Sequence, residues 1–91
     1  MTTEILMFTG PNCSACTAMK PIAEMLPNLK MVDITSDEAN KPDLQAGNMS
    51  LLQRYGIRGG IPVFVKLIDG VYEERTSGSM PQSVFNKWVA G

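Results

Sequence analysis

The chain's only two cysteines stand where a short apolar run gives way, through a Gly-Pro turn, to a helical pattern. A buried strand is expected over Glu4 to Phe8, because the residues from Ile5 onward are apolar without alternation. Gly10-Pro11-Asn12 is a turn sequence, and Asn12 is suited to be the N-cap of the helix that follows. A strand that leads directly into a helix favours an α/β arrangement, with Cys13 and Cys16 at the junction.

The residues after the cysteines predict a helix and then a second strand. Apolar side chains recur at helical spacing from about Cys13 to Met25, which indicates a helix with one buried face. Pro21 falls inside this helix and is expected to kink it. A second strand is expected over Lys30 to Ile34, and the polar stretch from Thr35 to Asn48 is expected to be a loop or weakly helical.

Two further helices are expected in the second half of the chain. A short helix from about Met49 to Tyr55 would have Asn48 as its N-cap and end at Gly56. The last helix is indicated by Ser79 and Gln82, which have the spacing of a capping box. An apolar stripe follows these two residues at helical spacing.

Between these two helices the sequence predicts a β-hairpin. Its strands are expected over Pro62 to Ile68 and over Val71 to Thr76. Asp69-Gly70 is a two-residue turn of the kind that needs positive φ. Glu73-Glu74-Arg75 indicates that the fourth strand is a wet edge strand of the sheet.

The predicted order is strand, helix, strand, helix, strand, strand, helix. This order gives an α/β fold with a four-stranded mixed sheet flanked by three helices. Helical crossovers join the first three strands, so we expect these strands to pair in parallel and the last two to pair antiparallel. The 91 residues are expected to form one domain, residues 1–91.

Composition and charge limit the kinds of partner. The formal net charge is −1 and the eight Lys and Arg residues are scattered, so we expect no nucleic-acid binding. No apolar run approaches the roughly 20 residues of a membrane span, and the N-terminus lacks a signal-peptide pattern. We therefore expect a cytoplasmic protein that does not enter membranes, and we expect it to be a monomer.

Cys13 and Cys16 have the spacing of a redox-active pair. Residues i and i+3 of a helix lie on one face about 5–6 Å apart, which is close enough for a disulfide. Cys13 would stand at the first turn, where unpaired backbone N–H groups and the helix dipole favour a thiolate. We expect Cys13 to attack a substrate disulfide and Cys16, one turn deeper, to resolve the mixed disulfide.

Two other interpretations of the cysteines stay open. A zinc site needs about four Cys or His ligands. The chain has no third cysteine and no histidine, so zinc could be held only between molecules, and we expect no metal. The pair could also be inert core cysteines, although the turn before them and the helix after them favour a reactive pair.

Ile61-Pro62, at the start of the third strand, is the second candidate element. A proline at that position has no N–H to donate to a neighbouring strand, so the sheet must tolerate one missing hydrogen bond. An X–Pro bond can be cis, and a cis Pro62 would turn the Ile61 backbone outward, free to pair with an extended substrate chain. An ordinary trans proline is the alternative and the commoner case among X–Pro bonds.

With these two elements the chain resembles the thioredoxin superfamily, in its small thioredoxin- or glutaredoxin-like form. Phe8 to Cys16 is similar to the family's strand, turn and active-site dithiol, and Pro21 stands where thioredoxins kink the active-site helix. Arg54 to Pro62 is similar to the approach to the family's cis-proline, and Gly78 before the last helix matches the thioredoxin ending. The resemblance covers nearly the whole chain.

The chain also departs from thioredoxins. Asn12 replaces the tryptophan before the first cysteine, and Ser14-Ala15 replaces the Gly-Pro between the two cysteines. Met7 falls near the buried acid that relays protons in thioredoxins. Asp33 would replace that acid only if it lies beneath the dithiol, and otherwise it caps the end of the second strand. Lys20 is similar to a glutaredoxin feature.

The resemblance implies a thiol–disulfide oxidoreductase that reduces protein disulfides and has no cofactor beyond the Cys13–Cys16 disulfide. The substrate-binding residues would be Pro11, Asn12, Ile61, Pro62 and Gly78. A thioredoxin-reductase-type flavoenzyme is implied as electron donor, and a ribonucleotide reductase is a candidate acceptor. A glutaredoxin-like protein recycled by glutathione and a redox-inactive binding module stay open. Lys20 and Arg58 either support the Cys13 thiolate or are ordinary solvated charges.

Overall fold

Four strands form a single mixed sheet in the computed structural model, which describes all residues 1–91. The sheet order is β2-β1-β3-β4, and the strands are β1 Thr3–Thr9, β2 Leu29–Asp33, β3 Val63–Ile68 and β4 Val71–Ser77. The four-stranded mixed sheet is confirmed, and every strand begins and ends within one residue of its expected position.

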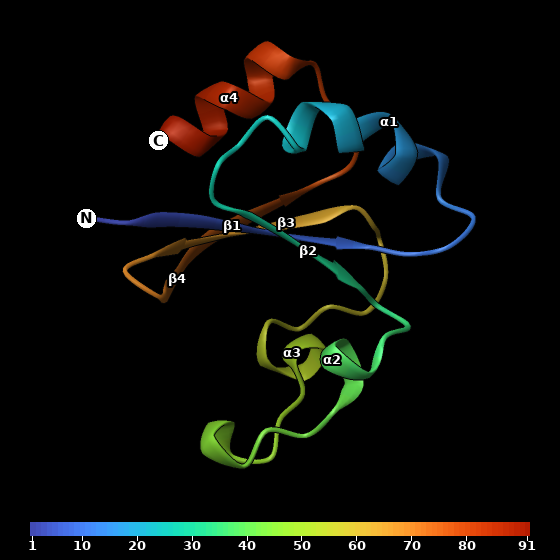
Figure 1. Ribbon diagram of the computed structural model, residues 1–91, viewed down its shortest axis with the longest axis vertical. Coiled ribbons are helices and arrows are strands. Elements are labelled where there is room, and N and C mark those ends of the chain that lie inside the picture. Colours follow the sequence, from blue (N-terminus) through green and yellow to red (C-terminus); the bar gives the residue numbers. More distant parts are fainter.

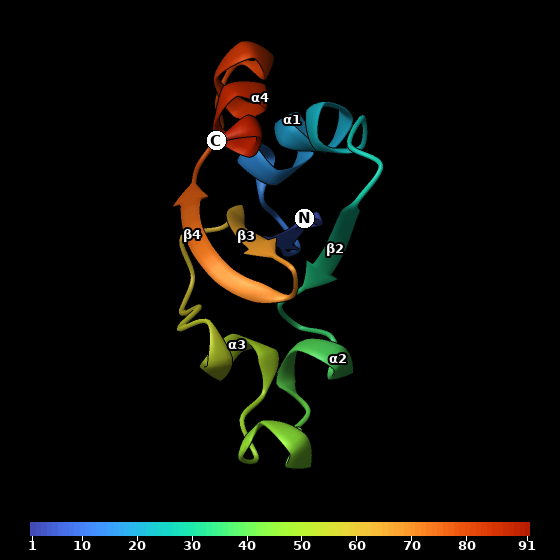
Figure 2. The same ribbon diagram turned by 90° about the vertical axis from the view of Figure 1, so that its left-hand side faces the viewer.

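Helices cover both faces of this sheet (Figure 1, Figure 2). α1 (Ser14–Ala23) and α4 (Gln82–Ala90) lie on one face, and the short helices α2 (Asp37–Asn40) and α3 (Leu51–Arg54) lie on the other. The expected three helices were one too few, because Ser36 caps α2 inside the polar stretch. None of the helices has the length and apolar character needed to cross a bilayer.

Each face of the sheet has its own apolar core. The buried residues toward α2 and α3 are Leu6, Phe8, Val32, Ala39, Ile57, Val63, Val65 and Leu67. Those toward α1 and α4 are Ile5, Met7, Met19, Ala23, Phe64 and Phe85. Successive residues of a strand point to opposite faces, so the segment from Ile5 to Phe8 supplies both cores. Burial on both sides explains why β1 is apolar without alternation.

β3 runs antiparallel to β1, which corrects the expectation that the first three strands pair in parallel. β1 and β2 are parallel, but Phe8 near the end of β1 lies opposite Val63 at the start of β3. A parallel return needs a crossover that carries the chain back along the whole sheet. α2 and α3 have 4 residues each, which is about 6 Å of helix, so the chain re-enters the sheet at the end where β2 finished.

The hairpin between β3 and β4 is confirmed. Asp69 and Gly70 have φ of 52° and 82°, which a tight turn of this kind requires. The register of the two strands shifts just after Lys66. The buried Lys66 ammonium donates to the carbonyl oxygen of Trp88 and lies 3.3 Å from the carboxylate of Glu74, so it joins both strands to α4.

The start of α3 differs from the expectation. Asn48 has a left-handed backbone with φ of 65°, whereas an N-cap residue is extended. Ser50 is the N-cap instead, and it forms a capping box with Gln53. Gly56 follows the helix with φ of 65°, as expected for a residue that ends it.

The start of α4 also differs. The helix begins at Gln82, and its N-cap position is Pro81, which provides no side-chain hydrogen bond. The capping box expected for Ser79 and Gln82 is therefore absent. A proline disfavours the helical conformation in the residue before it, so a helix cannot readily begin at Met80.

We expect Ser50→Ala to lower the free energy of unfolding of the oxidised protein by about 1 kcal/mol. The substitution removes the oxygen that accepts the Gln53 N–H at 3.2 Å. Urea denaturation followed by circular dichroism measures the change. Ser83→Ala on the exposed side of α4 is the matched control, with an expected change below about 0.5 kcal/mol. An equal loss in both variants would contradict this role for the cap.

Candidate functional site

The two cysteines lie where β1 turns into α1. Gly10, Pro11 and Asn12 form the turn, and Asn12 has φ of 56°, in the left-handed region. Asn12 is therefore not the N-cap that the sequence predicted, because an N-cap residue is extended. Cys13 takes that place with φ of −117° and ψ of 98°, and the helix is Ser14–Ala23 rather than Cys13 to Met25.

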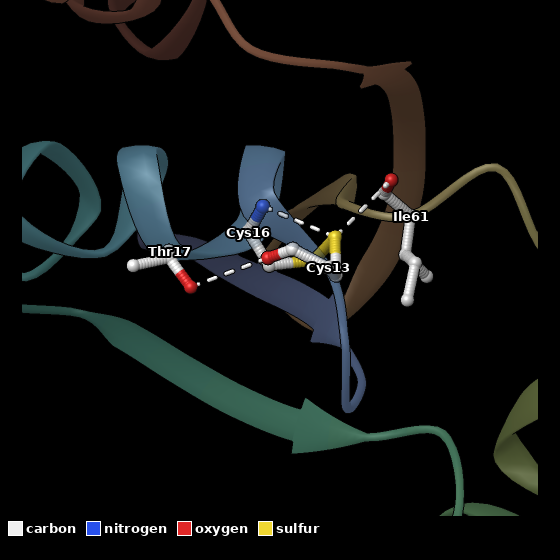
Figure 3. The surroundings of a disulfide bond; sticks show 4 residues. All are labelled: Cys13, Cys16, Thr17 and Ile61. Carbon is white, nitrogen blue, oxygen red and sulfur yellow. Dashed lines mark hydrogen bonds between the residues drawn. A yellow bond between two sulfur atoms is a disulfide. The ribbon is translucent and has the colours of Figure 1, made fainter.

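Cys13 and Cys16 are joined by a disulfide, and their Cα atoms are 5.2 Å apart (Figure 3). The two residues differ in access to solvent. Cys13 is half-buried, whereas Cys16 is only 1% exposed. A group that approaches from solvent therefore reaches Cys13 first. This asymmetry does not fit the interpretation of both cysteines as inert core residues.

The first turn of α1 directs two N–H groups at Cys13. The backbone N–H of Cys16 donates to Cys13 Sγ at 3.1 Å, and that of Thr17 donates to the Cys13 carbonyl oxygen at 3.1 Å. The Cys16 N–H and the positive end of the helix dipole stabilise negative charge on the sulfur, whereas the Thr17 bond is an ordinary backbone bond of the helix. The same geometry would favour a thiolate at Cys13 once the disulfide is reduced.

Ile61 and Pro62 join the site from a distant part of the chain. The Ile61-Pro62 peptide bond is cis, as the resemblance implied. The Ile61 carbonyl oxygen lies 3.7 Å from Cys13 Sγ (Figure 3). The pairing of β1 with β3 brings the two segments together, since Phe8 and Val63 lie opposite each other next to them.

Two glycines complete the surroundings of Ile61. Gly78, with φ of 89°, donates its N–H to the Pro62 carbonyl oxygen at 3.0 Å. A Cβ at Gly10 would lie 2.9 Å from Ile61 Cδ1, so glycine allows Ile61 to approach the turn. Of the residues predicted to bind substrate, Pro11 and Asn12 directly precede Cys13, and Ile61 lies against its sulfur. Pro62 follows Ile61, and Gly78 is hydrogen-bonded to Pro62.

The acidic residue considered for proton transfer, Asp33, is engaged in capping. It is exposed at the end of β2, and its carboxylate accepts the Thr35 Oγ1–H at 2.6 Å and the Thr35 N–H at 2.7 Å. These hydrogen bonds, with a smaller effect of Lys20, hold the pKa of Asp33 below its ordinary value.

Met7, the residue near the position of the thioredoxin acid, is fully buried. No group of three or more His, Cys, Asp or Glu side chains is placed to hold a metal ion.

Arg75 is the residue near the site whose position the sequence did not reveal. β4 is the exposed edge strand that Glu73, Glu74 and Arg75 predicted. The sequence did not show that the Arg75 side chain also lines a hollow with Arg58, Gly59 and Gly60, directly before Ile61 in the chain. The available signal was the period of two along β4, which puts Arg75 and Glu74 on opposite faces.

Solved structures with a similar fold include two thioredoxins. A mutant thioredoxin from Halobacterium salinarum NRC-1 aligns with a TM-score of 0.75 and 21% identity, over 96% of this chain and 71% of that one. Malassezia sympodialis thioredoxin, Mala s 13, aligns with a TM-score of 0.66 and 22% identity, over 97% of this chain and 72% of that one. No protein-family model and no curated protein matches the sequence.

We expect iodoacetamide to modify Cys13 of the reduced protein about tenfold faster than free cysteine at pH 6. The reason is that the Cys16 N–H, which points at Cys13 Sγ, should favour the thiolate form that reacts with iodoacetamide. Cys16 should react only after unfolding, because it is 1% exposed. Mass spectrometry of the digested protein locates the label. A Cys13 rate equal to that of free cysteine would contradict the expectation.

Proposed function

On the premise that this chain has the thioredoxin-superfamily fold, we propose that it is a thiol–disulfide oxidoreductase that reduces disulfides in protein substrates. The observation that carries the proposal is the asymmetry of the linked cysteines. Cys13 meets solvent at the start of a helix, and Cys16 is sealed behind it at bonding distance. Such a pair has one sulfur to meet the substrate and one to resolve the intermediate.

The reaction starts from the reduced protein, with Cys13 as the nucleophile. The Cys13 thiolate attacks one sulfur of the substrate disulfide, so that a mixed disulfide forms and the substrate S–S bond breaks. The second substrate sulfur leaves as a thiolate and takes up a proton. The N–H of Cys16 that points at Cys13 Sγ stabilises the attacking thiolate.

Cys16 completes the reaction as the resolving thiol. It loses its proton and attacks Cys13 Sγ, which forms the Cys13–Cys16 disulfide and releases the remaining substrate sulfur as a thiol. Two electrons pass from the protein to the substrate, whose two sulfurs take up one proton lost by Cys16 and one from solvent. The Cα–Cα distance of 5.2 Å is within the ordinary range for a disulfide, so this step needs no rearrangement of α1.

The backbone before Pro62 supports the proposed docking of a substrate chain. From Arg58 to Ile61, no N–H or C=O group takes part in a backbone–backbone hydrogen bond. An extended peptide can pair with such groups. Docking there would hold the substrate disulfide beside Cys13, with Pro11, Asn12 and Gly78 bordering the same chain.

The dithiol must be regenerated after each turnover, so the proposal includes an electron donor. We name a thioredoxin-reductase-type flavoenzyme as the donor and the cytoplasm as the compartment. The disulfide of a ribonucleotide reductase is one electron acceptor to be tested. The protein would act as a monomer, with the Cys13–Cys16 disulfide as its only redox group.

We expect Cys16→Ser to accumulate a mixed disulfide between Cys13 and a protein substrate, because the resolving thiol is missing. Cys13→Ser is the matched control and should form no stable adduct, since Cys16 is buried. Non-reducing gel electrophoresis and mass spectrometry detect the adduct. The two-step scheme is wrong if Cys16→Ser forms no adduct with any disulfide substrate.

A coupled assay identifies the electron donor. We expect NADPH consumption with a thioredoxin reductase and a protein disulfide, and none with glutathione plus glutathione reductase. The opposite result would assign the chain to the glutaredoxin-like alternative. The double variant Cys13→Ser, Cys16→Ser tests the binding-module alternative, since a redox-inactive module would keep its full biological activity without either thiol.

A further inference from the structure

All three arginines of the chain border two adjoining hollows on the α3 side of the hairpin. Arg58 and Arg75 line the first, and Arg54 and Arg75 line the second together with Tyr55 and Tyr72. We refer to the surface formed by these five residues as the arginine groove. The rings of Tyr55 and Tyr72 stack with centroids 6.2 Å apart, which gives the groove a flat aromatic wall.

The arginines of the groove have no anionic partner within the protein. The two ion pairs of the structure, Lys30–Glu38 and Lys66–Glu74, both use lysines. No Asp or Glu side chain lines either hollow. Arg75 donates to the Tyr55 carbonyl oxygen at 2.5 Å, which is its only hydrogen bond. The exposed guanidinium groups are therefore available to an external anion.

The acidic residues of the same strand face elsewhere. Glu73 and Glu74 line a hollow on the other face of the hairpin, beside Lys66 and Trp88. Arg54 borders a neighbouring hollow that also contains Glu38 and Asp43, so its charge is partly offset. Arg58 and Arg75, the two arginines nearest to Ile61 in the groove, would supply most of the attraction.

The groove is linked to the cysteine site through the chain segment before Ile61. Gly59 and Gly60 line its first hollow and lead directly to Ile61, whose carbonyl oxygen lies 3.7 Å from Cys13 Sγ. An extended chain advances about 3.3–3.6 Å per residue. Arg58 is only three residues before Ile61, so a substrate chain paired with the backbone at Ile61 would reach it within about three residues of its reacting cysteine.

We infer that the arginine groove binds an acidic segment of the partner protein, next to the disulfide that Cys13 attacks. The inference rests on the proposed function and adds the chemical class of its substrates. Guanidinium groups pair with carboxylates in a bidentate geometry that suits such a segment. A protein partner is favoured over nucleic acid, because nucleic-acid binding needs an extended basic surface. This chain has three arginines and a net charge of −1.

Peptide binding tests the inference without any redox step. The oxidised protein, labelled with ¹⁵N, is titrated with two blocked hexapeptides that lack cysteine and differ only in three Glu or three Gln residues. We expect the Glu peptide to bind at least about fivefold more tightly at low salt and to shift the amide signals of Arg58, Gly59 and Gly60. Added salt should weaken the difference. Equal affinities, or shifts confined to other regions, would overturn the inference.

Arg58→Gln is the matched variant, because the Arg58 side chain makes no hydrogen bond or ion pair in the fold. We expect it to weaken Glu-peptide binding about two- to fivefold and to leave Gln-peptide binding unchanged. Lys87→Gln, which removes the same charge from exposed α4, should change neither. Equal effects of the two variants would point to overall charge and overturn the assignment to the groove.

Competing ligands are tested in the same titration. Reduced glutathione or a thymidine hexanucleotide that binds these amides more tightly than the Glu peptide would overturn the choice of an acidic protein segment. The proposed function is read separately, from reduction of the uncharged hydroxyethyl disulfide. Reduction of that compound with no preference for the Glu peptide rejects only the groove. Preference for the Glu peptide with no reduction of any disulfide rejects only the redox proposal and supports the groove.

Discussion

The antiparallel pairing of β1 with β3 is the constraint on which the rest of the structure depends. It runs from Thr3 opposite Ile68 to Phe8 opposite Val63, so the chain just after β1 and the chain just before β3 emerge at the same end of the sheet. That juxtaposition puts the Ile61 carbonyl beside Cys13. The same two central strands separate the two apolar cores, which makes the position of the site inseparable from the packing of the whole domain.

The local geometry at Cys13 follows from how the first helix begins. A helix leaves its first backbone N–H groups without partners, and a side chain at the N-cap usually satisfies one of them. Cys13 does so here with its sulfur, which accepts the N–H of Cys16. The hydrogen bond that caps the start of α1 is thus also the one that would stabilise a thiolate at Cys13. Replacing this sulfur would disturb both the chemistry and the helix start.

The strands and the two site segments were predictable because their signals are local. Apolar runs flanked by turn residues mark each strand, and the cysteine spacing and Ile61-Pro62 mark the site. The direction of β3 could not be predicted, because it depends on how short α2 and α3 are. The polar sequence around these helices does not determine their lengths. Asn12 favours both an N-cap and a left-handed turn, and tertiary structure decided between them. The placement of Arg75 needs the observed register of β4 against β3.

The burial of Cys16 also bears on how the protein would tolerate peroxide. An oxidant from solvent would meet the sulfur of Cys13 and convert it to a sulfenic acid, while the sulfur of Cys16 is shielded by the interior. A neighbouring thiol condenses with a sulfenic acid to give a disulfide and water. The spacing that allows the Cys13–Cys16 disulfide would therefore return the oxidised sulfur to that disulfide, before the irreversible sulfinic and sulfonic acids can accumulate.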